Sequence, residues 1–378
     1  MKQMKIVFTL AILFVILVTG CAPAATPAAQ PPAPTQPPAP TEASAAQPPA
    51  PTQPPAPTEA PAASTAKLKF AMVTDQAGLG DQGFNDAAWA GLQKAKTDFN
   101  ADISVLESRE QSQYVPNFVS LAENKTDLIV GVGFLLTDAI TEAANQYPDS
   151  HFAIVDSVID LPNVASLVFK ENEGSFLVGA IAGMMSKTNT IGFVGGVESD
   201  LLKKFEAGYK AGVETTNPNA KVLVSYVGSF ADPAKGKEMA NAQYDQGADV
   251  SYEVGGLSGT GVIEAAKDRN LMVISVDRDK NYLAPNNVIS GMIKRVDTAV
   301  YLAAKMVADG NFKGGTYSYG VKEGGIDIAP TTKKMVPDDV YNVALDLKQM
   351  IIDGKVNPPK TLDELASFTP PKVNWPAK

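Results

Sequence analysis

Residues 68–106 read LKFAMVTDQAGLGDQGFNDAAWAGLQKAKTDFNADISVL, and this stretch decides the fold. Its two ends, residues 68–73 and 103–106, are short runs rich in apolar side chains, which is typical of buried strands. Between them apolar side chains recur every three or four positions, as one face of a helix requires, at Trp89, Leu92, Ala95 and Phe99. The stretch therefore predicts a strand, a helix and a second strand, the unit from which parallel sheets are built.

The same alternation of strand-like runs and helical patterns continues along the chain, and a long helix is predicted near residues 173–187. Such alternation is typical of parallel sheets with helices on both faces, so we predict an α/β fold. The further predicted strands are Leu128–Val132, Phe152–Val155, Val164–Phe169, Thr190–Val194, Val222–Val227, Val250–Val254, Met272–Val276 and Val288–Ile293.

The segment of residues 67–378 is longer than a domain with one hydrophobic core usually is, since single cores stop growing at about 250 to 300 residues. We therefore expect two lobes joined by a hinge, with a ligand site in the cleft between them. The first lobe is predicted to use mainly residues 67–165 and a later return of the chain. The second lobe is predicted to use mainly residues 190–285 and C-terminal segments.

The N-terminus has the build of a secretory signal. Met1–Lys5 is positively charged, and the apolar run Ile6–Val18 is shorter than the about 20 residues that a spanning helix needs. The run ends in Val18-Thr19-Gly20-Cys21, which resembles the bacterial lipobox. We predict a signal peptide over residues 1–20 and lipid attachment at Cys21, the only cysteine, which would anchor the protein on the extracytoplasmic side of the cell membrane.

Residues 21–66 form a segment of Ala, Pro, Thr, Gln and Ser that contains a repeat. Residues 30–46 recur as residues 47–63 with one change, Ser44 against Pro61. This composition cannot bury enough apolar surface to fold, and its prolines favour an extended chain. We predict a disordered tether; a proline-rich ligand for a partner domain is the alternative.

The residue counts exclude several classes of function. The chain has 41 acidic and 32 basic residues, whereas nucleic-acid binding requires a clustered basic face. One histidine, His151, and one cysteine cannot supply an imidazole or thiolate metal site, and no D-x-D-x-D-G calcium loop occurs. The G-x-S-x-G, H-E-x-x-H and cysteine–histidine patterns of hydrolases are also missing. We expect no nucleic acid, metal, cofactor or catalytic activity.

Three predicted strands end in an aspartate: Asp75, Asp156 and Asp277. In open parallel sheets, ligands bind beyond the carboxyl ends of the strands, where a carboxylate accepts hydrogen bonds from hydroxyl or ring N–H groups. Each aspartate alone could instead cap a helix or brace a turn. Three together favour a ligand site.

The loop after the first strand places Phe84 and Asn85 at the start of a helix, beside the expected cleft. An aromatic ring can stack on a planar base, and an amide can both donate to it and accept from it. The alternative is that Phe84 is a hydrophobic staple and Asn85 a helix cap.

For two other residues the local pattern favours a structural role. Phe205 lies on the apolar stripe of its helix, between Leu202 and Tyr209, which predicts core packing. Asp232 precedes Pro233, which predicts an N-cap followed by proline at the first helical position.

Gly255 and Gly256 join a strand to a helix without the spacing of dinucleotide or P-loop motifs. They can offer exposed backbone N–H groups and a close approach to a ligand hydroxyl. Lys294 follows the last predicted strand and could reach a ribose oxygen or remain a solvated surface charge.

Several motifs, taken in order, resemble the basic-membrane-protein family, the PnrA-like nucleoside-binding lipoproteins of bacterial ABC importers. The resemblance covers residues 67–330, and Ser157-Val158 and Arg278-Asp279 are departures from the family pattern beside two of the aspartates. The motifs are Asp81–Trp89, Glu171–Gly179, Ile191–Gly196, Lys204–Tyr209, Gly228–Gly236 and Lys294–Asp297.

The resemblance implies a type I periplasmic-binding-protein fold, with two Rossmann-like lobes of parallel sheets and three hinge crossovers. It implies a nucleobase between Phe84 and Phe205, against the local preference for a core role of Phe205. Asn85 and Asp156 would bind the base edge. The groups that would hold the ribose or nearby polar atoms are Asp75, Asp277, Lys294 and the backbone of Gly255 and Gly256.

The resemblance also implies a monomer that takes a purine nucleoside, such as inosine, guanosine or adenosine, to an importer of permease and ATPase subunits. Three alternatives stay open. They are a binder of another small polar solute, such as a sugar or an amino-acid-like compound, a surface sensor or adhesin, and a nucleoside-hydrolase-like enzyme.

Overall fold

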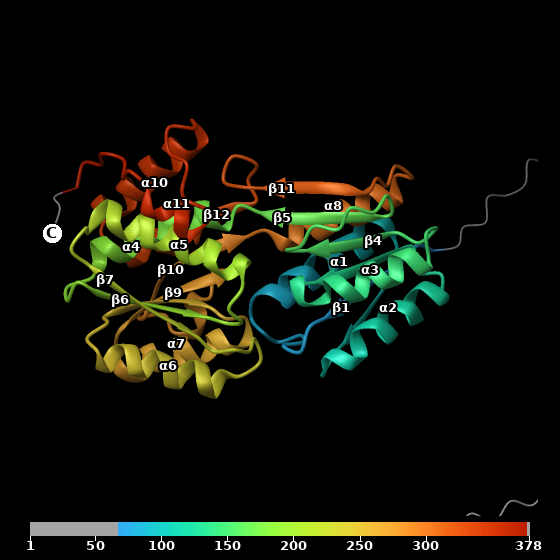
Figure 1. The fold of residues 1–378 in the computed structure, drawn as a ribbon, viewed down its shortest axis with the longest axis horizontal. Coiled ribbons are helices and arrows are strands. Elements are labelled where there is room, and N and C mark those ends of the chain that lie inside the picture. The colour runs from blue at the N-terminus through green and yellow to red at the C-terminus, as the bar shows by residue number, and fades with distance from the viewer. Residues whose placement is uncertain (1–66, 376–378) are drawn as a thin grey trace, which may run out of the picture. The chain divides into compact units, whose positions relative to one another are not determined.

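The computed structural model describes residues 67–375. The predicted signal peptide, the predicted lipid attachment at Cys21 and the proline-rich tether lie outside the described residues. Within the described part of the chain, the strands form two six-stranded sheets with helices packed on them (Figure 1). The predicted α/β class is confirmed.

The first sheet has strands whose neighbours all run parallel. Two of its central strands are wholly buried, which explains why they read as continuous apolar runs in the sequence. In spatial order the strands are β11 (Gly315–Tyr319), β5 (Val164–Phe169), β4 (Phe152–Val155), β3 (Leu128–Val132), β1 (Lys69–Thr74) and β2 (Asp102–Glu107).

The second sheet repeats this order with the next set of strands, and its edge strand β12 is antiparallel to its neighbour. In spatial order the strands are β12 (Ile326–Ile328), β10 (Val288–Lys294), β9 (Met272–Asp277), β8 (Val250–Val254), β6 (Thr190–Gly195) and β7 (Lys221–Tyr226). The two sheets therefore belong to two lobes of the same design.

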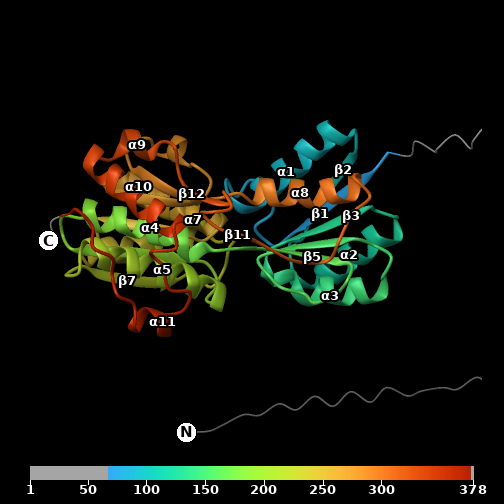
Figure 2. The ribbon, with the colours of Figure 1, turned by 90° about the horizontal axis from the view of Figure 1, so that it is seen from above.

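Helices cover both faces of each sheet. In the first lobe, α1 (Phe84–Phe99) and α8 (Val296–Ala308) pack together on one face, and α2 (Tyr114–Glu123) and α3 (Thr137–Gln146) cover the other (Figure 2). In the second lobe, α6 and α7 lie on one face, and α4 and α5 lie on the other. The bounds of the remaining helices are α4 (Glu171–Met185), α5 (Asp200–Thr216), α6 (Pro233–Asp245), α7 (Leu257–Arg269), α9 (Thr332–Met335), α10 (Asp338–Ile352) and α11 (Leu362–Ala366).

The chain passes between the lobes three times. It leaves the first sheet after β5 and enters the second lobe through α4, and it returns after β10 through α8 to form β11. A last short passage joins β11 to β12. The described residues thus contain three hinge crossovers, as the family resemblance implied.

Each of the ten predicted strands is present, with ends within one residue of the prediction. β11 and β12 were not predicted from the sequence. β11 reads GTYSY and is mostly exposed, and β12 has three residues, so neither carries the apolar run that marks a buried strand.

Candidate functional site

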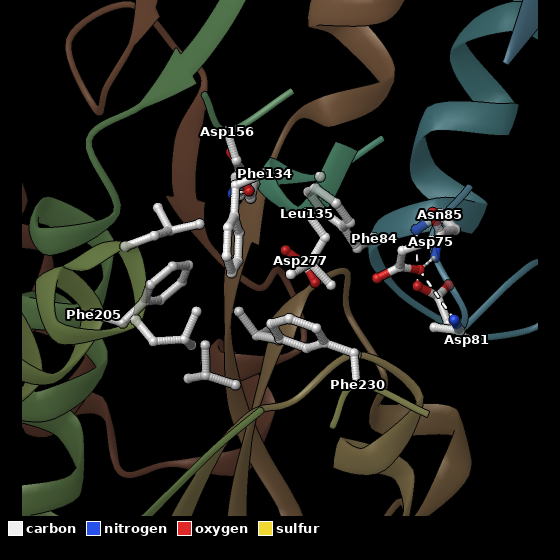
Figure 3. Close-up of a pocket in the computed structure, with 18 residues that line it drawn as sticks. Asp75, Asp81, Phe84, Asn85, Phe134, Leu135, Asp156, Phe205, Phe230 and Asp277 are labelled. Atoms are coloured by element: carbon white, nitrogen blue, oxygen red, sulfur yellow. Dashed lines mark hydrogen bonds and ion pairs between the residues drawn. The ribbon is translucent and has the colours of Figure 1, made fainter. Parts of the chain in front are cut away.

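A pocket lies at the carboxyl ends of strands from both sheets (Figure 3). Eight of the nine residues singled out in the sequence line it: Asp75, Phe84, Asn85, Asp156, Phe205, Gly256, Asp277 and Lys294. Gly255 is next to Gly256 in the chain but is not among the lining residues.

Asp81 organises the loop that carries Phe84 and Asn85. Its carboxylate accepts hydrogen bonds from the backbone N–H groups of Gly83 at 2.9 Å and Asn85 at 2.8 Å, so it satisfies the N-terminus of α1. Asn85 is therefore not the cap of this helix, and its side chain is available to the pocket.

Asn85 and Asp75 form a buried hydrogen-bonded pair. Asn85 Nδ2 donates to Asp75 Oδ1 at 3.0 Å, and the same oxygen accepts from the backbone N–H of Ala77 at 3.1 Å. The amide is thereby held with Oδ1 free, and this atom is buried with no partner in the part of the chain that the structure describes. A buried acceptor without a donor is costly unless a ligand or water supplies one.

Lys294 forms the second polar centre of the pocket. Its Nζ lies 2.5 Å from Asp156 Oδ2 and 3.1 Å from Glu171 Oε1, and Lys204 binds the other oxygen of Glu171 at 2.8 Å. Asp156 Oδ1 is buried and, like Asn85 Oδ1, has no partner among the described residues. The two free acceptors thus belong to the two residues predicted to bind a base edge.

Aromatic rings surround the same ammonium group. Lys294 Nζ lies 5.1 Å from the ring centroid of Phe84 and 5.5 Å from that of Phe205, both within cation–π range. Figure 3 shows these two phenylalanines on opposite sides of the pocket. Phe205 is 3% exposed and also belongs to the hydrophobic core. The core packing predicted from its helix and its position at the pocket are therefore compatible.

Two further aromatic residues line the pocket but were not predicted from the sequence. They are Phe134 and Phe230, whose rings meet edge to face at 6.1 Å. Phe134 follows Gly133 at the carboxyl end of β3. The three predicted aspartates also lie at the carboxyl ends of strands, so this position was a signal in the sequence. Phe230 lies in a loop with no periodic pattern. Leu201 and Leu202 of α5 complete the apolar wall.

Two further residues singled out in the sequence, Asp232 and Gly256, lie at helix starts. Asp232 is the N-cap of α6, because its side chain accepts from the backbone N–H of Lys235 at 2.9 Å, with Pro233 at the first helical position. This cap is confirmed. Gly256 has φ of 57°, a conformation that favours glycine, and it opens α7 beside Phe230.

Asp156 and Asp277 occupy equivalent positions in the two lobes, after β4 and at the end of β9. Both have φ of 66°, which is uncommon for residues other than glycine. Burial raises the pKa of Asp277 to about 6, although Lys294 and Lys280 oppose the shift. Burial also raises the pKa of Asp75 to about 6, and the hydrogen bond from Asn85 offsets only part of the effect.

The pKa of Lys294 is shifted in the opposite sense. Burial alone would lower it, but the charges of Asp156, Glu171 and Asp277 outweigh burial and raise it. Lys294 is therefore a charged donor in a pocket whose other polar side chains mainly accept. Such a site suits a ligand rich in hydroxyl and N–H groups.

Within residues 67–375, no group of three or more His, Cys, Asp or Glu is placed to hold a metal ion. No helix in this range is both long and apolar enough to cross a membrane.

Residues 68–361 match the family described as ABC transporter substrate-binding protein PnrA-like. The chain belongs to this PnrA-like family. It is 39% identical over 315 residues to the ABC transporter nucleoside-binding protein BmpA of Lactococcus lactis subsp. cremoris, a match that covers 77% of this chain and 89% of that protein. It is 37% identical over 288 residues to basic membrane protein D of Borreliella burgdorferi, covering 74% and 84%.

A solved ABC transporter solute-binding protein from Aeropyrum pernix K1 has the same fold. It matches this PnrA-like chain with a TM-score of 0.74 and 28% identity over 79% of this chain and 96% of that one. The predicted family and the type I periplasmic-binding-protein fold are confirmed. The PnrA-like chain is an ABC transporter solute-binding protein.

Proposed function

We propose that this protein binds a purine nucleoside, such as inosine, guanosine or adenosine, between its lobes and passes it to an ABC importer. One observation carries the proposal: Phe84 of the first lobe and Phe205 of the second flank one pocket. A flat ring between two aromatic faces gains stacking energy from both. A relative that is 39% identical carries the description nucleoside-binding, which agrees with this reading.

The polar groups of the pocket match the rest of a nucleoside. The free acceptors Asn85 Oδ1 and Asp156 Oδ1 would bind N–H groups at the base edge. The other polar atom of each side chain is hydrogen-bonded to a residue proposed for the ribose. Asn85 Nδ2 donates to Asp75, and Asp156 Oδ2 accepts from Lys294. Asp277 and the backbone beside Gly256 would complete the ribose site.

The charge of the pocket favours a nucleoside over a nucleotide. Four aspartates line it, against one cation, Lys294, among the described lining residues. Three of these aspartates, Asp75, Asp81 and Asp156, accept hydrogen bonds from donors of the protein, but a phosphate would still be repelled by the carboxylates of the pocket.

We further propose how the protein works in the membrane. An open form would expose half of the site on each lobe, and the ligand would favour the form in which the lobes meet. The permease and ATPase of the importer would respond to that form. Lipid on Cys21 and the segment of residues 21–66 would hold a monomer on the extracytoplasmic side of the membrane.

The proposal is tested by calorimetry on protein from which co-purified ligand has been removed. Inosine, guanosine or adenosine should bind tightly, and AMP and simple sugars should bind weakly. Phe84→Ala and Phe205→Ala should each weaken binding about fivefold to one hundredfold, since stacking contributes about 1–3 kcal/mol per base.

A matched control is Phe99→Ala, because Phe99 stacks on Tyr301 at 5.6 Å and does not line the pocket. This variant should bind inosine as tightly as the wild type. Binding of AMP but of none of the three nucleosides would overturn the proposal, and so would unchanged affinity in both pocket variants.

A further inference from the structure

A buried ion pair lies just behind the pocket. Lys280 Nζ is 2.8 Å from Glu253 Oε1, and both side chains are 0% exposed. Glu253 Oε1 also accepts from the backbone N–H of Val276 at 3.1 Å. Burying two charges is expensive, and such a pair is weak evidence for a stabilising role, so its position needs a separate explanation.

Lys280 belongs to the second lobe, but it lies against the binding loop of the first. A Cβ atom added to Gly83 would lie 3.1 Å from Lys280 Nζ and 3.3 Å from Asp277 Oδ2. Gly83 directly precedes Phe84 and Asn85, so Lys280 lies against the loop that places both residues in the pocket.

Three carboxylates face Lys280, and each comes from a different element. Glu253 lies in β8, Asp277 ends β9, and Asp81 lies in the loop before α1 of the other lobe. In this arrangement Asp81 of the first lobe and Glu253 both repel the like charge of Asp277. Lys280 is the cation placed among them.

A second contact beside Lys280 and Gly83, closer to the surface, also joins the lobes. The Tyr282 hydroxyl donates to Gln82 Oε1 at 2.6 Å, although Tyr282 is 60% exposed. Gln82 has φ of 58°, a strained conformation for a residue with a side chain. We call Gln82, Gly83, Lys280 and Tyr282 the interlobe clasp.

We propose that the interlobe clasp sets how readily the two lobes close, with Lys280 as the positioning residue that offsets the carboxylates gathered by closure. Glu253 holds Lys280 at this place, and the Tyr282–Gln82 hydrogen bond secures the outer edge. The effect on ligand affinity rests on the proposed nucleoside function, whereas the effect on the lobes of the ligand-free protein does not.

The decisive variants change the net charge of the residues around Lys280 by one unit at a time. Lys280→Met makes the cluster of Asp81, Glu253, Asp277 and Lys280 more negative by one charge, and adding Glu253→Gln restores its net charge. The single variant should weaken inosine binding about tenfold or more, as expected when one partner of a buried ion pair is removed. The double variant should regain most of that loss.

Lobe closure is measured directly by pulsed electron spin resonance between spin labels on α3 and α7. Cys21 is the only cysteine, so labels at Glu142→Cys and Lys267→Cys in a Cys21→Ser background are specific. Ligand-free Lys280→Met should populate longer interlobe distances than the wild type. The double variant should return toward the wild-type distribution.

Two further variants guard against misreading a folding defect. Tyr282→Phe removes only an exposed hydroxyl, so it should fold normally and still shift the distances toward the open form. Lys237→Met removes the surface pairs with Glu264 and Asp268 in the second lobe, away from the clasp, and should leave the distances unchanged.

The clasp proposal is overturned if Lys280→Met lowers stability while the ligand-free distances stay as in the wild type. It is also overturned if Glu253→Gln fails to rescue a folded Lys280→Met variant. A wild type that binds no nucleoside would instead contradict the proposed function, and the ligand-free distances would still decide the role of the clasp.

Discussion

The carboxyl groups of Asp75 and Asp277 hold protons up to an unusually high pH, since burial raises each pKa from 3.8 to about 6. Hydroxyl and N–H donors of a ligand favour the ionised carboxylates and therefore lower these pKa values on binding. Affinity should be fully developed only well above pH 6, where both groups are ionised, and should fall as the pH drops through 6. In the ligand-free protein the raised pKa values add to the free energy of unfolding in acid. This contribution is lost as the pH rises through about 6.

This pH dependence can be measured by titrating inosine calorimetrically at pH 5, 6, 7 and 8 in buffers of different ionisation enthalpy. The expected loss is up to about tenfold per pH unit below 6 for each carboxyl that must ionise. Protons should be released to the buffer at pH 5. The Asp75→Asn variant should show a flatter profile, and an affinity that is equal at pH 5 and pH 7 in the wild type would contradict the assignment.

Much of the pocket could be predicted from single residues because position after a strand is visible in the sequence. Asp75, Asp156 and Asp277 each follow a short apolar run, and all three line the pocket. Phe205 could not be assigned from its helix alone, because one side chain packs in the core and also faces the pocket. Phe230 had no local signal, since only the tertiary fold brings its loop to the site.

At the scale of elements, α4 and α5 pack with unusually close backbones. A Cβ atom on Gly212 would collide with the carbonyl oxygen of Phe176, and one on Gly179 would collide with that of Tyr209. Small residues are therefore required where the helices cross. The contact matters for the site because α5 carries Phe205 and α4 begins at Glu171, which binds Lys294.

Gly212→Ala should therefore destabilise the protein, because the added methyl group must push α4 and α5 apart. Overpacking of this kind costs about 1–3 kcal/mol, more than the about 1 kcal/mol of helix propensity that alanine gains over glycine. Urea unfolding measures the change. Glu214→Ala, at an exposed position of α5, is the control, and equal stability of the two variants would refute the close-packing argument.

Most of the strands that were predicted are buried, and buried strands must be apolar along most of their length, so they are visible in the sequence. The predicted strands β2 (DISVLE) and β7 (KVLVSY) lie at sheet edges, but each still carries three aliphatic residues. β11 is mostly exposed and β12 has only three residues, and they form only because the chain returns to each lobe. Their existence depends on the crossovers, which no local pattern records.

At the scale of the whole molecule, the pocket has no complete wall in either lobe. Asp75, Phe84 and Asp156 belong to the first lobe, and Phe205 and Asp277 belong to the second. Lys294 ends β10, immediately before a crossover, and pairs with Asp156 of the other lobe. Ligand binding is thereby coupled to the arrangement of the lobes through contacts that cross the pocket.

A nucleoside held by both lobes should protect both against unfolding. At about 100 times its dissociation constant, a ligand adds about 2.7 kcal/mol to the free energy of unfolding. Hydrogen exchange should slow together at the amides of β1 and β9, which end at the pocket from opposite lobes. The Phe84→Ala variant should need proportionally more inosine for the same protection in both strands. Slower exchange in one strand alone would mean that the ligand binds a single lobe, and a site built from two half-pockets would then be wrong.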